Sequence, residues 1–248
     1  MHPVLFTLGN TIFYTHGVMA TLGAILGIFF AYILAPKQNK SKVVDNLIIT
    51  AIFGVIGARL VYLLIYSDQF FTIGSYFSLT GGGFVSYGGI FFSAGTLALI
   101  LKKQKQNILS WFDFTAPAFF LGLGIGRIGE ILAGEYSGVD TNSIIAHGFL
   151  PISVFNTPFY EAVLCFLLFG FGARIYQKNK SMPGRTALVL FNMYALARFA
   201  IDFGRVEARI FLNLSLGQVI SLALFIFSAI LLVRAIKTTI QRSKNETD

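Results

Sequence analysis

Three arginines lie inside long apolar stretches of the sequence, where a charged side chain needs a reason. Arg59, Arg127 and Arg198 each interrupt a block that is otherwise rich in aliphatic and aromatic residues. An ionisable group at the centre of a bilayer costs at least ~2.5 kcal/mol. A guanidinium stays charged and presents a fork of N–H donors that fits a pair of anionic oxygens. These residues therefore indicate a site for phosphate, and the phosphates at membrane depth belong to phospholipid headgroups.

Other polar residues fall at the same depth as these arginines. If consecutive spans alternate in direction, the arginines lie in the outer thirds of the second, fourth and sixth spans. The polar residues near the outer ends of the first, third and fifth spans are His16, Tyr87, Tyr160 and Glu161. Residues from six helices thus share one depth, and this convergence predicts a functional site there.

Simpler structural interpretations stay open for several of these residues. Arg59 could only anchor its helix at the membrane surface, and His16 could be a packing histidine. Arg198 shares a helix face with Tyr194 and Asp202, so an Arg–Asp pair there could be structural. Two acidic residues at inner helix ends, Asp45 and Asp113, are expected to be solvated or to cap helices.

Arg127 is harder to explain as an anchor, because it stands in a glycine-rich run at 122–130. Such glycines let the backbones of neighbouring membrane helices approach closely. The run also matches the pattern G-x-G-x-x-G, but no strand precedes it, which excludes a dinucleotide-binding fold.

The elements that must position these residues are membrane-spanning helices. Of the 248 residues, 55% are hydrophobic and 12% are charged, whereas a soluble domain carries about 25% charged residues. The apolar residues form blocks near the ~20 residues that cross a bilayer as a helix. We predict an all-α integral membrane protein with one transmembrane domain over 1–248. Its seven helices are expected at about 12–35, 43–66, 84–101, 110–133, 159–176, 186–203 and 215–236.

The basic residues predict the orientation of this bundle. Fourteen of the nineteen follow the first, third, fifth and seventh blocks or flank the turn after the fifth. By the positive-inside rule these connections are cytoplasmic, which explains the net charge of +8 without nucleic acid. The N-terminus is then outside, and a basic tail at 237–248 lies inside. Short outer segments are expected at 67–83 and 134–158, the first partly along the membrane interface.

Residue types alone leave three classes of protein open. A clamp on a lipid phosphate serves a lipid binder, a lipid or anion transporter, or an enzyme from which phosphate departs. A transporter would need polar groups in the inner half of the membrane, where the sequence has few. No metal or cofactor is predicted, and the single cysteine, Cys165, is expected to be a buried apolar residue.

A series of ordered motifs narrows this choice. They are YTHGVM (14–19), GARLVY (57–62), GGGFVSYGG (81–89), GRIGEILAGE (126–135), PFYE (158–161), YALARF (194–199) with Asp202 and Arg205, and SLGQ (215–218). In this order and spacing they resemble the prolipoprotein diacylglyceryl transferase family over nearly the whole chain. The match at 113–135 resembles the family signature most strongly.

The resemblance implies an enzyme of the bacterial plasma (inner) membrane with its active site facing the outer leaflet. The diacylglyceryl group of phosphatidylglycerol would pass to the lipobox cysteine thiol near the signal peptide of a prolipoprotein, releasing glycerol-1-phosphate. The implied catalytic residues are Arg127, Arg198, His16, Tyr87 and Glu135. The implied substrate-binding residues are Arg127, Arg59, Tyr194, Arg205, Glu130, Tyr160, Gly88 and Gly89. Arg127 and Arg198 would stabilise the departing phosphate.

Two features depart from the family pattern. Many members carry Tyr at the position of His16 and His at the position of Tyr87, so the two residue types are exchanged here. Because a thiol reacts as its thiolate, we predict that His16 is its base or hydrogen-bond partner. Glu130 replaces a usually neutral residue and could weaken the hold of Arg127 on phosphate. These departures leave open a non-catalytic or altered-substrate homologue that binds anionic phospholipid, or a small anion or lipid transporter.

Overall fold

In the computed structural model most of the chain is helical. The structure describes residues 2–9, 11–65, 83–136, 138–178, 182–206, 209–211 and 213–245. Among these residues, six segments are long and apolar enough to cross a membrane: Thr15–Leu34, Lys37–Ile65, Ile108–Ala133, Thr157–Lys178, Arg185–Gly204 and Leu216–Ala235. The protein is thus a multi-pass helical membrane protein. The expected outer segment 67–83 lies, apart from its last residue, outside the described residues.

The third predicted block contains a shorter helix, α4 (Ser86–Lys103). It has 18 residues and ends on Lys102 and Lys103, which lower its mean hydropathy below that of the other candidates. The structure therefore supports six candidate spans, and the seventh stays a prediction.

One compact unit comprises Ala35–Ile108. Its elements are a short 3-10 helix (η1, Lys37–Asn39), α2 (Lys40–Ile65) and α4. Small residues allow α2 and α4 to pack closely, since a Cβ on Gly88 would lie 2.6 Å from the carbonyl oxygen of Gly57. Near the other end of this pair, the side-chain amides of Asn46 and Gln104 exchange hydrogen bonds of 3.1 and 2.9 Å.

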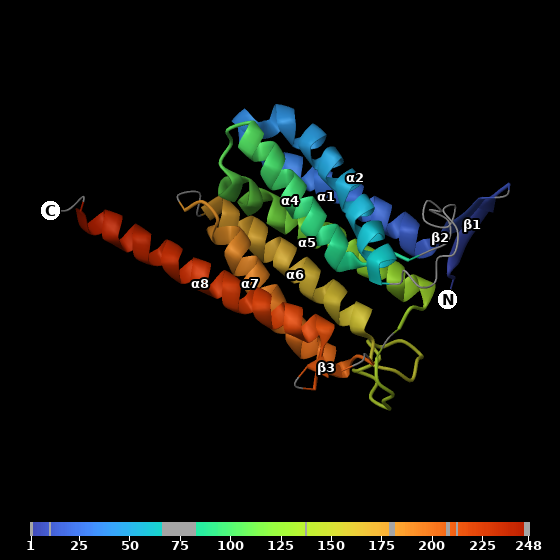
Figure 1. Ribbon diagram of the computed structural model, residues 1–248. Helices are drawn as coiled ribbons and strands as arrows, with labels where there is room; N and C mark the ends of the chain where they lie inside the picture. Colours follow the sequence, from blue (N-terminus) through green and yellow to red (C-terminus); the bar gives the residue numbers. More distant parts are fainter. Residues whose placement is uncertain are drawn as a thin grey trace. The chain divides into compact units, whose positions relative to one another are not determined.

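The second unit comprises Met1–Leu34 and Leu109–Asp248. It contains α1 (Thr15–Leu34), α5 (Ile108–Ala133), α6 (Thr157–Lys178), α7 (Arg185–Ile201) and α8 (Leu216–Asn245). α7 packs between α6 and α8, and α8 continues through most of the predicted basic tail (Figure 1). Apolar side chains of α5, α6 and α7 form its core, with Phe120, Leu168 and Leu190 almost fully buried.

Two short hairpins, which the sequence analysis did not predict, flank the helices of this unit. β1 (Val4–Leu8) pairs with β2 (Thr11–Tyr14), and β3 (Arg209–Phe211) pairs with β4 (Leu214–Ser215). The first hairpin is tied to the end of α5, because the amide of His2 donates to the carbonyl of Leu132 at 2.9 Å. After the second, Ser215 and Gln218 cap α8 reciprocally, each amide donating to the other side chain.

The glycine-rich run around Arg127 brings α1 and α5 together, as the sequence predicted. A Cβ on Gly122 would lie 2.8 Å from the carbonyl oxygen of Gly23, and a Cβ on Gly129 would lie 2.7 Å from Cβ of Met19. Such distances exclude larger side chains unless the helices separate. These glycines set the spacing between α1 and the helix that carries Arg127.

Asp113 lies in the second turn of α5 but caps a different helix. Its carboxylate accepts hydrogen bonds from the amides of Gly184 (2.6 Å) and Ala187 (3.0 Å) at the start of α7, and the residue is 5% exposed. Of the two predicted alternatives, capping is therefore the one found. This bond fixes α7 against α5 at the end of the unit opposite to Arg127 and Arg198.

Candidate active site

Three helix ends of the second unit meet at the candidate site. Arg127 lies near the C-terminal end of α5, Glu161 near the start of α6, and Arg198 in the last turn of α7. Because α6 runs opposite to the other two, these residues come to the same end of the bundle (Figure 1).

Glu161 holds the two arginines together. Its Oε2 lies 3.0 Å from Nε of Arg127 and 2.9 Å from Nη1 of Arg198. The glutamate side chain is 1% exposed, and the arginine side chains are 13% and 7% exposed. A buried charge is tolerated when it is paired, and here one carboxylate serves two guanidinium groups.

Two further carboxylates and a phenol complete this group. Glu130 Oε1 lies 2.5 Å from Nη1 of Arg127, and Asp202 Oδ1 lies 3.0 Å from Nη2 of Arg198. The spacings of three and four residues place each pair on one helical face. The Tyr194 hydroxyl donates to Oε1 of Glu161 at 3.2 Å. We call Glu130, Arg127, Glu161, Arg198, Asp202 and Tyr194 the arginine cluster.

His16 and Glu135 form a separate pair. His16 is the second residue of α1, and Glu135 follows the end of α5. The distance from His16 Nδ1 to Glu135 Oε2 is 3.6 Å, and the side chains are 43% and 58% exposed. This separation exceeds a hydrogen bond, so the contact is electrostatic when the imidazole is protonated. Both side chains are accessible to a ligand.

Four predicted site residues lie in the Ala35–Ile108 unit. Arg59, 7% exposed, donates from Nη1 to the carbonyl of Gly83 at 3.0 Å. Its guanidinium also faces the rings of Tyr62 in α2 and Phe84 just before α4. Tyr87, the second residue of α4, is 37% exposed. Gly88 and Gly89 pack against α2, which gives the glycines a structural role whether or not substrate reaches them.

Tyr160 and Arg205 lie where the outer segment meets the helix ends. The Tyr160 hydroxyl donates to the carbonyl of Ile145, and its ring stacks on Phe155 with centroids 5.0 Å apart. Backbone pairing joins Arg205 to Gly138. Tyr160 thus supports the segment 138–156 through its contacts with Ile145 and Phe155.

Tyr136 also belongs to this outer segment, directly after Glu135. Its hydroxyl donates to the carbonyl of Ile131 at 3.0 Å. Desolvation by partial burial raises the pKa of the phenol above its ordinary value. Tyr136 is therefore a neutral hydrogen-bonding side chain that holds the chain against the end of α5.

Glu161 was expected at the same depth as the arginines, but no role was predicted for it. It contributes the carboxylate that both arginines share. The available signal was a glutamate near the start of an apolar span, at a depth where an unpaired charge is costly. Which side chains would pair with it depends on the packing of three helices, and local sequence does not specify that packing.

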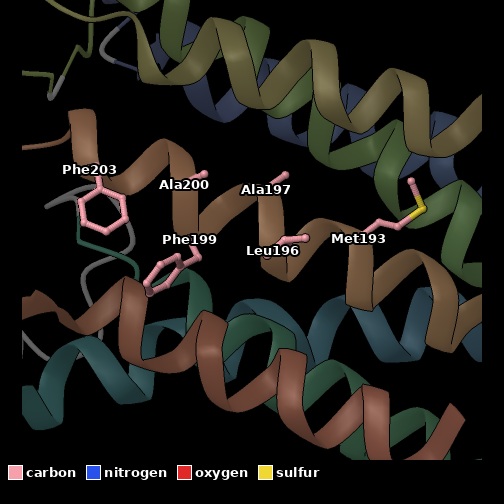
Figure 2. Close-up of a pocket in the computed structure, with 6 residues that line it drawn as sticks. All are labelled: Met193, Leu196, Ala197, Phe199, Ala200 and Phe203. Atoms are coloured by element: carbon pink, nitrogen blue, oxygen red, sulfur yellow. The ribbon is translucent and has the colours of Figure 1, made fainter. Parts of the chain in front are cut away.

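A cavity of about 460 Å³ lies along α7, away from this cluster (Figure 2). It is lined by Met193, Leu196, Ala197, Phe199, Ala200 and Phe203. At 100° per residue, most of these positions fall on the face of α7 opposite to Arg198. The cavity is apolar and does not contribute to the charged site.

The bundle and its cluster define a polytopic membrane protein with two arginines and three carboxylates gathered in a nearly buried site at one end of its helices. The family model described as prolipoprotein diacylglyceryl transferase matches residues 3–234. The chain therefore belongs to the prolipoprotein diacylglyceryl transferase family.

Several curated proteins named phosphatidylglycerol–prolipoprotein diacylglyceryl transferase are similar to the chain. The protein from Finegoldia magna is 29% identical over 244 residues, covering 97% of this chain and 98% of the relative. The protein from Clostridium tetani is 30% identical over 243 residues, covering 90% and 93%. The similarity therefore extends over the full length of the helical bundle.

Proposed function

We propose that this protein transfers the diacylglyceryl group of phosphatidylglycerol to the lipobox cysteine of a prolipoprotein. The sulfur forms a bond to the glyceryl carbon, and the bond from that carbon to the phosphate oxygen breaks. The electron pair leaves on glycerol-1-phosphate, and the thiol proton passes to a base. The observation that carries this proposal is the pair of buried arginines bridged by Glu161, in a chain of this family.

Arg127 and Arg198 are the proposed stabilisers of the departing phosphate. Negative charge grows on the phosphate oxygens as the carbon–oxygen bond breaks, and fixed cations lower the energy of that state. Each guanidinium has five N–H donors. Two nitrogen atoms of Arg127 and two of Arg198 take part in the ion pairs of the cluster. Glu161 keeps both arginines in place before substrate arrives, and Tyr194 orients Glu161.

His16 is the proposed base for the thiol, with Glu135 beside it. Both side chains are more than 40% exposed, so a peptide can approach them, whereas the arginine cluster is almost fully covered. Tyr87 is proposed to supply a phenol to the reaction.

The remaining predicted residues are proposed to bind substrate. Arg59 and Arg205 are proposed to add positive charge that attracts the anionic headgroup of the lipid. Tyr160 is proposed to support the outer segment next to that headgroup. Gly88 and Gly89 are proposed to leave room for the lipid beside Tyr87.

We further propose seven spans, with the N-terminus outside, the C-terminus in the cytoplasm and the site at the outer leaflet of the inner membrane. Within the second unit, Arg174, Lys178 and Arg185 lie at the end of α6 and the start of α7. The arginine cluster lies at the opposite ends of these two helices. Since basic connections are cytoplasmic, the cluster then faces the outer leaflet.

The test is a transfer assay with the purified protein in detergent, phosphatidylglycerol and a synthetic lipobox peptide. Mass spectrometry is expected to detect the diacylglyceryl adduct on the peptide. The adduct should vanish with Arg127→Ala and with a peptide whose cysteine is replaced by serine. A monodisperse protein that retains lipid but forms no adduct would instead indicate a lipid-binding homologue.

A further inference from the structure

Glu130 differs from the other two carboxylates of the arginine cluster in how firmly it is held. Glu161 is 1% exposed and bonds Arg127, Arg198 and Tyr194. The side chain of Asp202 is 0% exposed. Glu130 is 17% exposed, and within the described part of the chain Arg127 is its one ion-pair partner. A rotamer change can therefore move its carboxylate away without any movement of the backbone.

Departure of Glu130 would leave Arg127 in place. The Nε of Arg127 is held by Glu161 at 3.0 Å, whereas Glu130 contacts Nη1 at 2.5 Å. The two glutamates therefore bind different nitrogen atoms of one guanidinium. The Oε1 atom of Glu130 marks a point where an anionic oxygen contacts this guanidinium.

The charge of the cluster also favours an exchange. Two arginines against three carboxylates give 2 − 3 = −1 when all are ionised. A phosphate diester that entered with Glu130 still in place would raise the negative charge of a nearly buried site to −2, which is costly. Replacement of Glu130 by the phosphate keeps the charge at −1.

We propose that Glu130 is an internal occupant of the phosphate subsite, which the phosphate of the incoming lipid displaces from Arg127. This inference rests on the proposed function and adds a specificity-determining residue to it. Because Glu130 competes with the lipid phosphate for Arg127, it weakens the binding of phosphatidylglycerol. Once Glu130 is displaced, the same two arginines stabilise the departing phosphate. Glu130 therefore controls KM for the lipid more than kcat.

The test compares Glu130→Gln and Glu130→Ala with the unmodified protein. Both variants are expected to lower KM for phosphatidylglycerol about tenfold, because a charge-assisted hydrogen bond is roughly twice as strong as a neutral one. The value of kcat should change less than threefold. Asp140→Asn is the matched control, because Asp140 is an exposed acid of the outer segment outside the cluster, and its KM should stay unchanged.

Lipid binding without turnover separates this inference from the proposed function. Native mass spectrometry with phosphatidylglycerol in detergent should show a Kd about tenfold lower for both variants, even if no peptide is modified. A second arm measures inhibition by glycerol-1-phosphate, which carries the same phosphate chemistry without a lipid. An unchanged or raised Kd and KM for phosphatidylglycerol would overturn the inference. Stronger glycerol-1-phosphate inhibition alone would also overturn it, because the displacing phosphate would not belong to the lipid.

Discussion

At the scale of single residues, Glu161 is the side chain that connects the arginine cluster. Its carboxylate contacts two guanidinium groups and one phenol from two other helices. Buried arginines repel each other, so their common carboxylate is what allows both guanidinium groups to lie close together. Removal of this carboxylate should therefore affect folding and catalysis together.

Glu161→Gln is expected to destabilise the protein by about 3–5 kcal/mol, the usual cost of leaving a buried charge without its partner. Transfer activity should fall at the same time, because the arginines lose their fixed position. Thermal unfolding in detergent and the peptide assay measure the two effects. Cys165→Ala, one turn along α6 and equally buried, controls for altered packing. Unchanged stability would contradict the bridging role.

His16→Gln tests the proposed base. Loss of general-base catalysis typically costs about 10²–10⁴-fold in rate, and a loss of this size is expected here. The transfer rates of the variant and of the unmodified protein are compared in the peptide assay. His2→Gln, an exposed histidine, is the control. Full activity of His16→Gln across pH would remove His16 from the mechanism.

At the scale of secondary-structure elements, the helix ends that carry the site are fixed by contacts at their far ends. Asp113 joins α5 to the first turn of α7 through two backbone amides. An α-helix leaves its first amides without internal partners, and these amides are buried here. The carboxylate of Asp113 therefore accepts hydrogen bonds from the otherwise unpaired amides at the start of α7. It also sets the position of α7 beside α5, at the ends of these helices that lie away from the arginine cluster.

Asp113→Ala is expected to lower the free energy of unfolding by about 1–2 kcal/mol, the typical cost of a lost cap. Asp45→Asn should have little effect, because Asp45 is an exposed acid in the second turn of α2. Thermal unfolding of both variants in the same detergent provides the comparison. Equal stability of the two would show that the cap is dispensable.

Long apolar blocks predicted the helices well because length and hydropathy are local properties of the sequence. The first hairpin was missed, although Gly9 and Asn10 form a turn signal between two short apolar runs. Its strands are so short that their pattern is weaker than that of the long helical block that follows, and part of the second strand was assigned to that block. The partners of Glu161 and Asp113 could not be predicted, because each lies on another helix and depends on tertiary packing.

At the scale of the whole molecule, charge distribution and function are linked through orientation. In the proposed topology fourteen basic residues lie in connections at one side of the membrane, and the segment 135–158 has neither lysine nor arginine. The proposed position of the candidate site at the outer leaflet rests on that asymmetry.

Single cysteines test this orientation directly. Cys165 is fully buried, so it should react little with a membrane-impermeant thiol reagent. In intact cells Asn142→Cys, in the outer segment, is expected to be labelled. Gln38→Cys, exposed after α1, should be labelled only after the membrane is opened. The reverse pattern would invert the proposed topology.

The contact between Gly23 and Gly122 has a consequence for the order of biosynthesis. The two glycines are separated by roughly a hundred residues of sequence, which a ribosome needs about 5–20 s to add at 5–20 residues per second. During that interval α1 is already synthesised, while the helix that will cover its glycine face does not yet exist. The pair of His16 and Glu135 thus forms only after α5 has been completed, so the proposed base meets its carboxylate late in the assembly of the protein.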